Sequence, residues 1–597
     1  MTKDRNWQAS QSGESVAPCC LRRSAGTHNQ DWPVEMNTLT TLLSIPLLAA
    51  LSLATSQATQ RAQAEDVRDD SKTVRVFIFA GQFNMVGSDS KAQHVHRFPP
   101  FAGLDLPQEN VLFSYNIGRE DKRISDGWVP LRPIDNVVGP ELSFARRVST
   151  ETQAPIAIIK CAAGGTTLGG DWNPDEPSGF QLYPLALQLV QSSLAELDKK
   201  KLSYRIEGFM WHQGENDMFT KEYRPNYERN LKRFLACWRR DLNAPDLKFY
   251  IGELCTKTIW GMDNRENMYA IRTGQKAVTD SDPLAEYIPT SHVAVEIGGR
   301  EGLHYHYGTL GQLEHGENYA DAYLRTIGNV STEESKLVPW PYEAGSEVNL
   351  FVLAGHRNME GERAFKQDLG SLGEDKVLAS ENQHIAFKYN IGGGYKASRG
   401  WLSLGPAGFY DTFGPELSFG KTLQSNMSGN IAIIKFTHSG SQMNDWTPKG
   451  TIAKDRNLYA RFIDFINESK SELEARGHKV KLAGIFYHVG ENDMAFGPYR
   501  KNSASWLHSL VTQSRLDLGN PTLRWYVSQQ PPPDIEGLKA IDATANIAAI
   551  AATDPSFIHI KVFDLPQQAE QLVFTSDAIV QLGKLLARAF LDTQHEN

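Results

Sequence analysis

The sequence predicts an α/β fold used twice, as two tandem three-layer α/β/α domains with mostly parallel sheets. Short apolar runs rich in β-branched and aromatic residues alternate with amphipathic helical patterns, which is typical of parallel sheets covered by helices on both faces. An ordered set of motifs also occurs twice along the chain. With 597 residues, 41% of them hydrophobic, the chain is long enough for two domains that each bury their own core.

The chain begins with a segment that has the features of an export signal. The apolar run Thr41–Ala54 is too short to span a bilayer but fits the apolar core of a secretory signal. The A-Q-A sequence at Ala62–Ala64, before Glu65, fits a cleavage site. We therefore interpret residues 1–64 as a signal region, with Met36 as an alternative start, and expect a secreted or periplasmic protein. The alternative is that the apolar run forms a buried or interfacial helix.

Composition excludes several classes of protein. The formal net charge is −9 and the body of the chain has no dense basic stretch, which argues against nucleic-acid binding. No apolar run reaches the ~20 residues that a membrane span needs. Five cysteines are too few for a disulfide-based scaffold. Removal of the signal region leaves Cys161, Cys237 and Cys255, an odd number, so we expect at least one unpaired thiol.

The rest of the chain contains the same motifs twice. Six motifs recur in the same order at an offset of about 275 residues: V-F-I-F-A-G-Q-F-N-M-V-G (76–87, again as L-F-V-L-A-G-H-R-N-M-E-G at 350–361), Y-N-I-G (115–118 and 389–392), G-P-E-L-S-F (139–144 and 414–419), I-A-I-I-K (156–160 and 431–435), D-W (171–172 and 445–446) and G-E-N-D-M (214–218 and 490–494). This period is far too long for a solenoid. We therefore predict two homologous domains, at residues 65–335 and 336–597, joined near the proline-containing stretch Asn329–Ser346.

Within the first copy the pattern alternates strand, loop and helix. Val74–Ala80, Ala157–Lys160 and Ile206–Trp211 are short apolar runs followed by glycine and polar residues, as expected of buried parallel strands. Tyr183–Leu197 and Tyr227–Arg240 have the apolar spacing of helices. Because loops at the carboxyl ends of parallel strands meet at one edge of a sheet, the G-Q-F-N-M, G-G-T and G-E-N-D-M loops should converge and form the site.

These loops resemble those of the SGNH hydrolases, in particular the sialate O-acetylesterase-like branch of the carbohydrate acetylesterases. In that family the first strand ends in G-Q-S-N-M, whose serine is the nucleophile. A glycine loop follows a later strand, a third loop carries G-E-x-D after W-x-Q, and a final D-x-x-H supplies acid and base. Here the third loop is W-H-Q-G-E-N-D (Trp211–Asp217) and the final motif is E-G-L-H-Y (Glu301–Tyr305). The resemblance covers both copies, and it implies a flavodoxin-like fold, acetylated carbohydrate as the ligand, and neither a cofactor nor a metal.

The resemblance also implies a role for each loop. His304 would be the general base, oriented by Glu301. The oxyanion donors would be the backbone N–H at position 83, a glycine of the second loop and an amide side chain of the third loop. The candidate oxyanion and substrate residues of the first domain are Gln82, Asn84, Gly164, Gly165, Gln213, Gly214, Glu215 and Asn216, and the second-domain equivalents are Arg357, Asn358, Glu491 and Asn492.

Both copies lack the nucleophile that this family uses. Phe83 and Arg357 stand where the family has serine. Neither side chain can attack an ester, because Phe has no nucleophilic atom and Arg stays protonated in proteins. The nearest hydroxyls, Ser88 and Ser90, lie past the turn and should point elsewhere. The second copy also has Val489 in place of a loop glutamine, so we predict that the second domain is degenerate and inactive.

Alternatives remain open for the base and for the function. We match Val573 of E-Q-L-V-F (570–574) with His304, which favours His304 as the base, whereas spacing from the following helix favours His306. The chain is either an exported carbohydrate O-acetylesterase-like hydrolase, in which His304 activates water, or a catalytically dead tandem pseudo-esterase that binds acetylated carbohydrate. A third alternative makes the second domain a scaffold for the first.

Several other side chains have both a functional and a structural interpretation. Trp172, Trp211 and Trp446 either line a sugar-binding groove or pack in the core, and the core is the more common place for such residues. Met85 and Met359 are expected to fill the core. The G-E-N-D loops persist even in the degenerate copy, which favours a structural role for them.

Overall fold

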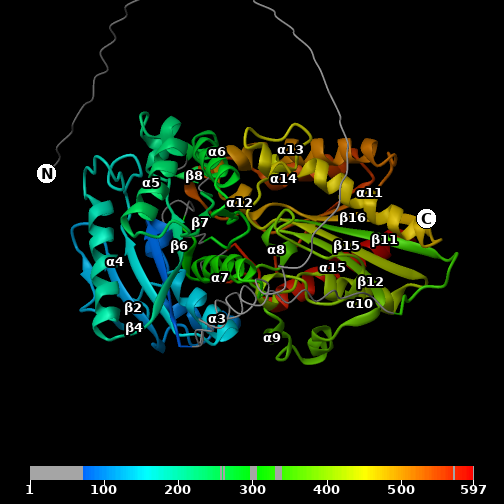
Figure 1. Ribbon diagram of the computed structural model, residues 1–597. Coiled ribbons are helices and arrows are strands. Elements are labelled where there is room, and N and C mark those ends of the chain that lie inside the picture. Colours follow the sequence, from blue (N-terminus) through cyan, green and yellow to red (C-terminus); the bar gives the residue numbers. More distant parts are fainter. Residues whose placement is uncertain are drawn as a thin grey trace, which may run out of the picture. The chain divides into compact units, whose positions relative to one another are not determined.

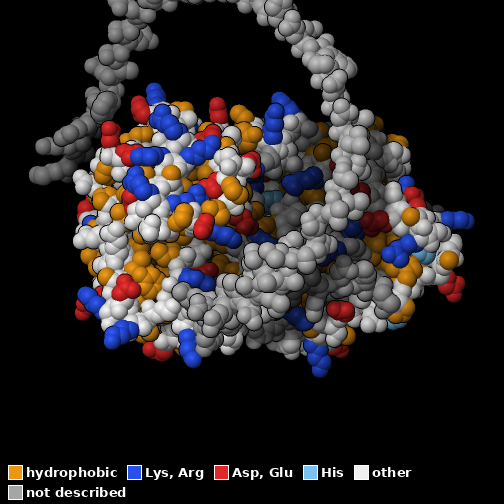
Figure 2. Space-filling view, in the orientation of Figure 1, with side chains coloured by type: hydrophobic (Ala, Val, Ile, Leu, Met, Phe, Trp, Pro, Cys, Tyr) orange, Lys and Arg blue, Asp and Glu red, His pale blue; other side chains and the backbone are white. Residues whose placement is uncertain are grey.

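In the computed structural model the described residues are 72–255, 258–259, 262–295, 306–329, 339–568 and 572–595. The predicted signal region and the candidate residues Glu301 and His304 lie outside them. Both repeats lie within one compact unit, Arg68–Asn597. Among the described residues, no helix is both long enough and apolar enough to cross a membrane. On the face shown in Figure 2, Lys and Arg side chains are interspersed with Asp and Glu.

The first repeat folds around an eight-stranded sheet (Figure 1) in the order β10-β7-β6-β1-β5-β2-β3, with β4 paired to β2. All neighbours are parallel except β3 and β4, which run antiparallel to β2. The strands are β1 Val74–Gly81, β2 Gln108–Ile117, β3 Arg123–Ile124, β4 Val129–Leu131, β5 Ile156–Ala162, β6 Tyr204–His212, β7 Phe249–Gly252 and β10 Ala285–Ile288. The three strands predicted from the sequence are therefore confirmed.

Helices cover both faces of this sheet, because successive residues of the central strand point to opposite sides. Val76 and Ile78 pack with residues of α4, α5 and α6, whereas Phe77 and Phe79 pack with residues of α3 and α7. This arrangement gives the three layers that the continuous apolar strands predict. The helices are α2 Phe83–Val86, α3 Glu141–Thr152, α4 Leu182–Lys199, α5 Tyr227–Asp241, α6 Arg265–Ser281 and α7 Gly308–Thr326.

The second repeat has the same architecture, with the sheet order β18-β17-β16-β11-β15-β12-β13 and β14 paired to β12. Even an irregularity is shared, since the register shifts between Val76 and Phe77 in β1 and between Leu350 and Phe351 in β11. The strands are β11 Glu347–Gly355, β12 Asn382–Ile391, β13 Lys396–Ala397, β14 Leu402–Leu404, β15 Asn430–Thr437, β16 Lys479–His488, β17 Trp525–Gln529 and β18 Phe557–Lys561. The main helices are α8 Arg357–Glu360, α10 Glu416–Asn426, α11 Tyr459–Ala475, α13 Gly497–Asp517, α14 Ala543–Thr553 and α15 Ser576–His595.

Two of the repeated motifs meet in each domain as a buried ion pair. Lys160 Nζ of I-A-I-I-K lies 2.7 Å from Glu141 Oε2 of G-P-E-L-S-F, and Lys435 Nζ lies 2.9 Å from Glu416 Oε2. Each lysine also donates to the last carbonyl of the short helix that follows the central strand, α2 or α8. Removing one partner would leave a buried charge uncompensated, so the two motifs depend on each other. Their joint recurrence in the sequence has this structural cause.

The tryptophans of the repeated loops are part of the core. Trp172, Trp211 and Trp446 have no exposed surface. Trp172 and Trp211 pack edge to face, with ring centroids 5.2 Å apart. The groove-lining alternative is therefore wrong for these three residues. Met85 and Met359 are also fully buried, as predicted.

Candidate functional site

The three loops that follow β1, β5 and β6 converge in the first repeat, as the sequence predicts. Gln213 Nε2 donates to Gln82 Oε1 at 2.8 Å and to the carbonyl of Thr166 at 3.1 Å, so one side chain joins all three loops. Gln82 Nε2 in turn donates to Asn216 Oδ1 at 3.0 Å. Gln82 and Gln213 are fully buried, and they position Asn216, which is half-exposed. In the second repeat Val489 stands in the place of Gln213. Valine has no amide, so it cannot make these hydrogen bonds between the loops.

In the second repeat the short helix after the central strand begins at a carboxylate of the G-E-N-D loop. Glu491 accepts the backbone N–H of Arg357 at 3.3 Å and that of Asn358 at 2.7 Å, and so caps the helix N-terminus. In the first repeat Glu215 accepts from the Asn84 side chain at 3.4 Å. Burial raises the pKa of both carboxyls to about 7. This glutamate therefore contacts the turn after the central strand in both repeats.

The aspartate of G-E-N-D fixes the second loop in both repeats. Asp217 accepts the backbone N–H of Leu168 at 2.8 Å and that of Gly169 at 3.1 Å. Asp493 accepts the backbone N–H of Met443 at 3.0 Å. Burial raises the pKa of Asp217 to about 6, although these hydrogen bonds lower it. The structural interpretation of the G-E-N-D loops is thus favoured in both copies.

The asparagine of each turn binds the backbone just before the last helix. Asn84 Oδ1 accepts the backbone N–H of Tyr307 at 3.0 Å, and Asn358 Oδ1 accepts that of Phe574 at 2.7 Å. These equivalent contacts place position 307 opposite position 574. The same offset relates the hydrogen bonds from α3 to α7 and from α10 to α15. Our matching of Val573 with His304 was therefore wrong, since Val573 occupies the place of His306.

His306 lies directly beside the position of the missing nucleophile. Its Nδ1 is 2.7 Å from Asp89 Oδ2, and its ring centroid is 4.9 Å from that of Phe83. The Phe83 ring also covers Gly164, because a Cβ built there would meet Phe83 Cε1 at 2.9 Å. Enzymes that hydrolyse esters often place a histidine next to the nucleophile. A carboxylate then binds the other ring nitrogen of that histidine.

Sequence reasoning missed Asp89 as a partner of His306. The sequence offers one indirect signal, which is that the residue is an aspartate. Aspartate tolerates a positive φ better than most residues, and Asp89 has φ +60°. The neighbouring Ser90 is no substitute nucleophile, because its hydroxyl is buried and donates to the carbonyls of Gly87 at 2.6 Å and Val138 at 2.8 Å. Ser90 therefore holds the loop and points away from Phe83, as predicted.

The other candidates divide into buried supports and partly exposed groups. Phe83, Gly164, Gly165 and Asn216 are half-exposed and His306 is 8% exposed, so these residues border the first-domain site. Gln82, Asn84, Gln213, Gly214 and Glu215 are buried and act through their neighbours.

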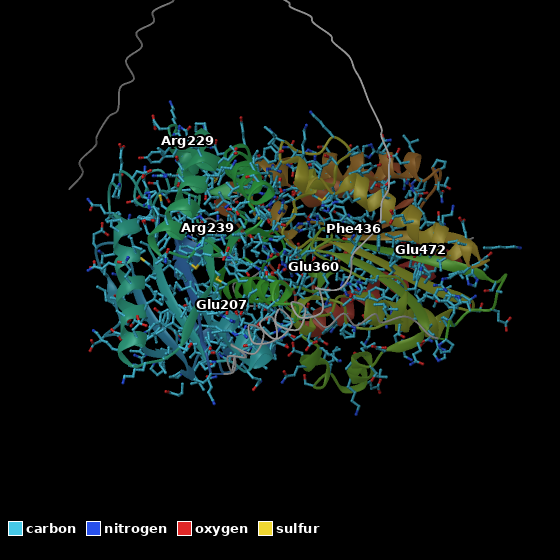
Figure 3. All side chains as sticks on the ribbon, in the orientation of Figure 1. Glu207, Arg229, Arg239, Glu360, Phe436 and Glu472 are labelled. Carbon is cyan, nitrogen blue, oxygen red and sulfur yellow. The ribbon has the colours of Figure 1, made fainter. Side chains whose placement is uncertain are left out.

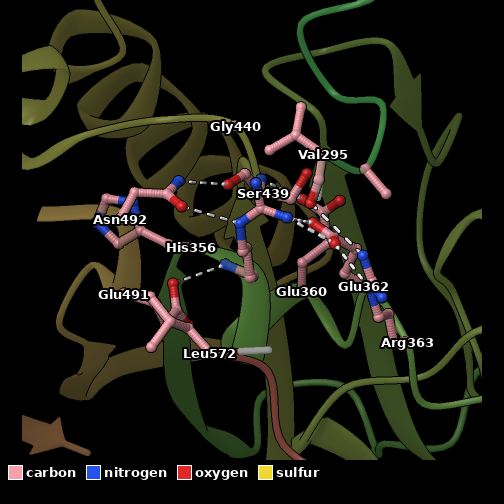
Figure 4. Close-up of polar contacts among 12 residues, drawn as sticks. Val295, His356, Glu360, Glu362, Arg363, Ser439, Gly440, Glu491, Asn492 and Leu572 are labelled. Carbon is pink, nitrogen blue, oxygen red and sulfur yellow. Dashed lines mark hydrogen bonds and ion pairs between the residues drawn. The ribbon is translucent and has the colours of Figure 1, made fainter. Parts of the chain in front are cut away.

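In the second repeat an arginine fills the equivalent place. Arg357 is 1% exposed, and its Nη1 lies 2.6 Å from both oxygens of Glu362. Arg357 Nε donates to Asn492 Oδ1 at 3.1 Å, and Figure 4 shows Asn492 and Glu362 on opposite sides of this cluster. Glu360, the last residue of α8 (Figure 3), accepts the backbone N–H of Ser439, which stands where the first repeat has Gly164. The side chains of Arg357, Glu362 and Asn492 are thus paired with one another at the place where a ligand would bind in the first repeat.

The family model described as carbohydrate esterase, sialic acid-specific acetylesterase matches this chain twice, at residues 73–325 and 347–592. The chain belongs to this family. Each match spans one of the two sheets and its helices, so the carbohydrate esterase family accounts for both repeats.

The chain is also similar to individual proteins. A probable carbohydrate esterase from Arabidopsis thaliana is 29% identical over 182 residues, which cover 29% of this chain and 66% of that protein, slightly less than two thirds. The crystal structure of NanS has 15% identity and a TM-score of 0.34, and the match covers 44% of this chain and 99% of that chain. A carbohydrate acetylesterase from Xanthomonas citri has 15% identity and a TM-score of 0.31, with 44% and 58% covered.

Proposed function

We propose that the first domain binds O-acetylated carbohydrate at the site bordered by Phe83, Gly164, Asn216 and His306, and that it lacks covalent esterase catalysis. The observation that carries this proposal is the packing of the Phe83 ring against both Gly164 and His306. The ring takes the place of the family's serine, and a phenylalanine side chain has no atom that can attack an ester. The polar groups at the rim, Asn216 among them, are retained for recognition.

A second candidate function is slow hydrolysis by water. The pair of His306 and Asp89 favours it, because a carboxylate 2.7 Å from Nδ1 orients the imidazole as a general base. Loss of a triad nucleophile costs about 10⁶ in kcat in a well-studied protease, while about 10³–10⁴ over water remains from the rest of such a site. Hydrolysis by this route would therefore be far slower than that of a complete esterase.

We further propose that the protein is exported and that the second domain, residues 336–597, has no esterase activity. Export is supported by the apolar run Thr41–Ala54 with a cleavage-site pattern after it. Inactivity is supported by Arg357, which is buried between Glu362 and Asn492. Acetylated carbohydrate is the expected partner of the first domain, whereas nucleic acid and an integral membrane segment of the mature protein are not expected.

The test is to compare the wild type with Phe83→Ser and Arg357→Ser in hydrolysis of p-nitrophenyl acetate and acetylated xylan. We expect negligible hydrolysis by the wild type and a gain in Phe83→Ser, because its hydroxyl would lie near His306. Arg357→Ser is the matched control, since Val573 takes the place of the base there, and no gain is expected. Binding of acetylated and deacetylated xylo-oligosaccharides to the wild type is measured by calorimetry. Rapid wild-type hydrolysis, or no preference for the acetylated ligand, would overturn the proposal.

A further inference from the structure

The segment after β10 of the first repeat lies across the site of the second repeat. Ser439 Oγ donates to the carbonyl of His292 at 3.0 Å, and Arg363 donates to the carbonyl of Val295 at 3.5 Å. Figure 4 shows Val295 beside the cluster that contains Ser439, Glu362 and Arg363. Residues 290–295, which we call the bridging segment, therefore contact the loop that in the first repeat borders the ligand site.

An aromatic contact fixes the same segment from its other side. The His292 ring stacks on Tyr395, with centroids 3.8 Å apart and planes 19° apart, and Phe409 lies 4.9 Å away. Tyr395 OH donates to Asn318 Oδ1 at 2.9 Å, and the Asn318 amide is 3.3 Å from His292 Nε2. His292 is 3% exposed, so the second repeat buries a ring that belongs to the first.

The fit is close enough to require a glycine. A Cβ built on Gly440 would meet the carbonyl oxygen of Ser291 at 2.0 Å, which no side chain tolerates. Gly440 is the counterpart of Gly165 in the first repeat, where the nearest atom to such a Cβ is Arg119 Nη1, the end of a flexible side chain. The two equivalent glycines thus serve different contacts, one with the bridging segment and one beside the first-domain site.

The first repeat holds the bridging segment through α7. The backbone N–H of Ala294 donates to Glu314 at 2.7 Å, and Tyr410 of the second repeat donates to the carbonyl of Glu314 at 3.2 Å. Every residue of α7 from Gly308 to Ala320 is buried, although several are polar. A helix with buried polar residues on all sides needs partners on all sides, and the second repeat supplies them on the face that carries Glu314 and Asn318.

We propose that the loops of the second repeat that are equivalent to the first-domain site form a receptor for the bridging segment of the first repeat, and that this docking, together with the contact of Tyr410 with α7, supports the position of His306. The second domain then acts as a built-in scaffold for the first-domain site instead of binding a second carbohydrate. The docking is inferred from the hydrogen bonds and the ring stack between the two repeats. Only its effect on carbohydrate binding rests on the proposed function.

Variants of the full-length chain test the docking. Tyr395→Ala removes the stack on His292, whereas Tyr395→Phe keeps the ring and loses only its hydroxyl. Gly440→Ala places a methyl group against Ser291, and Gly537→Ala is the matched control, because no atom lies within 4 Å of a Cβ there. Hydrogen–deuterium exchange is measured for peptides that cover the bridging segment and, as an internal reference, β11.

We expect Tyr395→Ala and Gly440→Ala to speed exchange in the bridging segment at least tenfold, with β11 unchanged, while Tyr395→Phe and Gly537→Ala match the wild type. If Gly440→Ala does not fold, the docking is tested with Tyr395→Ala and the milder Ser439→Ala, again by hydrogen–deuterium exchange in the bridging segment. Wild-type exchange rates in the bridging segment of folded Tyr395→Ala would overturn the docking. The same variants are then expected to weaken carbohydrate binding. Faster exchange with unchanged binding would remove the supporting role, and absence of binding in the wild type would count against the proposed function alone.

Discussion

The ring of Phe83 lies against the imidazole of His306, with centroids 4.9 Å apart, while Asp89 is 2.7 Å from the Nδ1 atom of the same imidazole. In the first domain an imidazole with a carboxylate partner thus lies beside a position that holds a hydrocarbon ring. In the second domain Val573 stands in the place of His306, and Arg357, in the place of Phe83, is paired with Glu362. The two repeats share the asparagine contact beside this position but fill the position itself with different side chains.

The identity of the base can be decided in the Phe83→Ser background. We expect His306→Ala to lower the gained hydrolysis rate by about 10²–10⁴, the usual contribution of a general base. His304→Ala should leave the rate within about threefold, a margin well below that contribution. The measurement is kcat for p-nitrophenyl acetate. The reverse result, with His304 essential and His306 dispensable, would return the role to the residue that the family motif indicates.

Asp89 is expected to act on the same step. In the Phe83→Ser background, Asp89→Asn should lower kcat with little change in KM, because the amide no longer favours the tautomer and the charge that the base needs. Asp121→Asn on the exposed loop after β2 is the control and should have no effect. An equal rise in KM with unchanged kcat would show that Asp89 serves binding and does not orient the base.

Removing one partner of the buried ion pair between Arg357 and Glu362 should lower the free energy of unfolding strongly, whereas replacing both partners should lower it little. Their side chains are 1% and 3% exposed. Arg357→Met alone leaves the carboxylate without its main partner and should lower the free energy of unfolding by about 3–5 kcal/mol. The double variant Arg357→Met/Glu362→Gln should recover most of this loss. Chemical denaturation of the wild type, Arg357→Met, Glu362→Gln and the double variant gives the coupling energy, and additive effects would contradict the prediction.

Asn358 should contribute to stability through the loop that it holds. Asn358→Ala removes the acceptor of the Phe574 N–H and the donor to the Leu572 carbonyl, both in a buried setting. Leaving one such group unsatisfied costs about 1–3 kcal/mol. Asn502→Ala on the exposed face of α13 is the control, with an expected change within about 0.5 kcal/mol. Equal denaturation midpoints for the two variants would disprove this role.

Acidification should destabilise the chain through His292. The pKa of His292 is lowered from 6.5 to about 4, chiefly by burial and in part by Arg456, while Glu253 and the hydrogen bond to Asn318 oppose the shift. Between pH 4 and 6.5 the unfolded chain therefore binds more protons at this site than the folded chain, so stability rises with pH in this window. In His292→Phe, which keeps a ring but cannot titrate, the slope of melting temperature against pH should be smaller than in the wild type. Identical slopes would exclude the effect.

Much of the fold could be predicted because it depends on patterns that lie close together in the sequence. Successive residues of a strand point to opposite faces of the sheet, so Val76 and Phe77 of β1 both need an apolar layer to pack against. The continuous apolar run therefore predicted helices on both faces, which is the three-layer architecture. The repeat predicted two equal domains, and the positions of Phe83 and Arg357 predicted the loss of the nucleophile. Convergence of the loops followed from parallel strands alone.

The register of the last loop could not be obtained in this way. Its match between the repeats is weak in sequence, and Val573 was paired with the wrong histidine. The Asn84–Tyr307 and Asn358–Phe574 hydrogen bonds correct the pairing, because they join residues more than 200 positions apart. Such contacts leave no local periodicity.

The sequence by itself indicated two tandem esterase-like α/β/α domains with Phe83 and Arg357 at equivalent positions, since strands, helices and motif order are encoded locally. Only the tertiary structure decided what took the place of the lost chemistry. Phe83 packs on His306, Arg357 is neutralised by Glu362, and His292 of one repeat stacks on Tyr395 of the other. The physical reason is that packing and ion pairing depend on which distant side chains share a buried space, and that is set by the assembled fold.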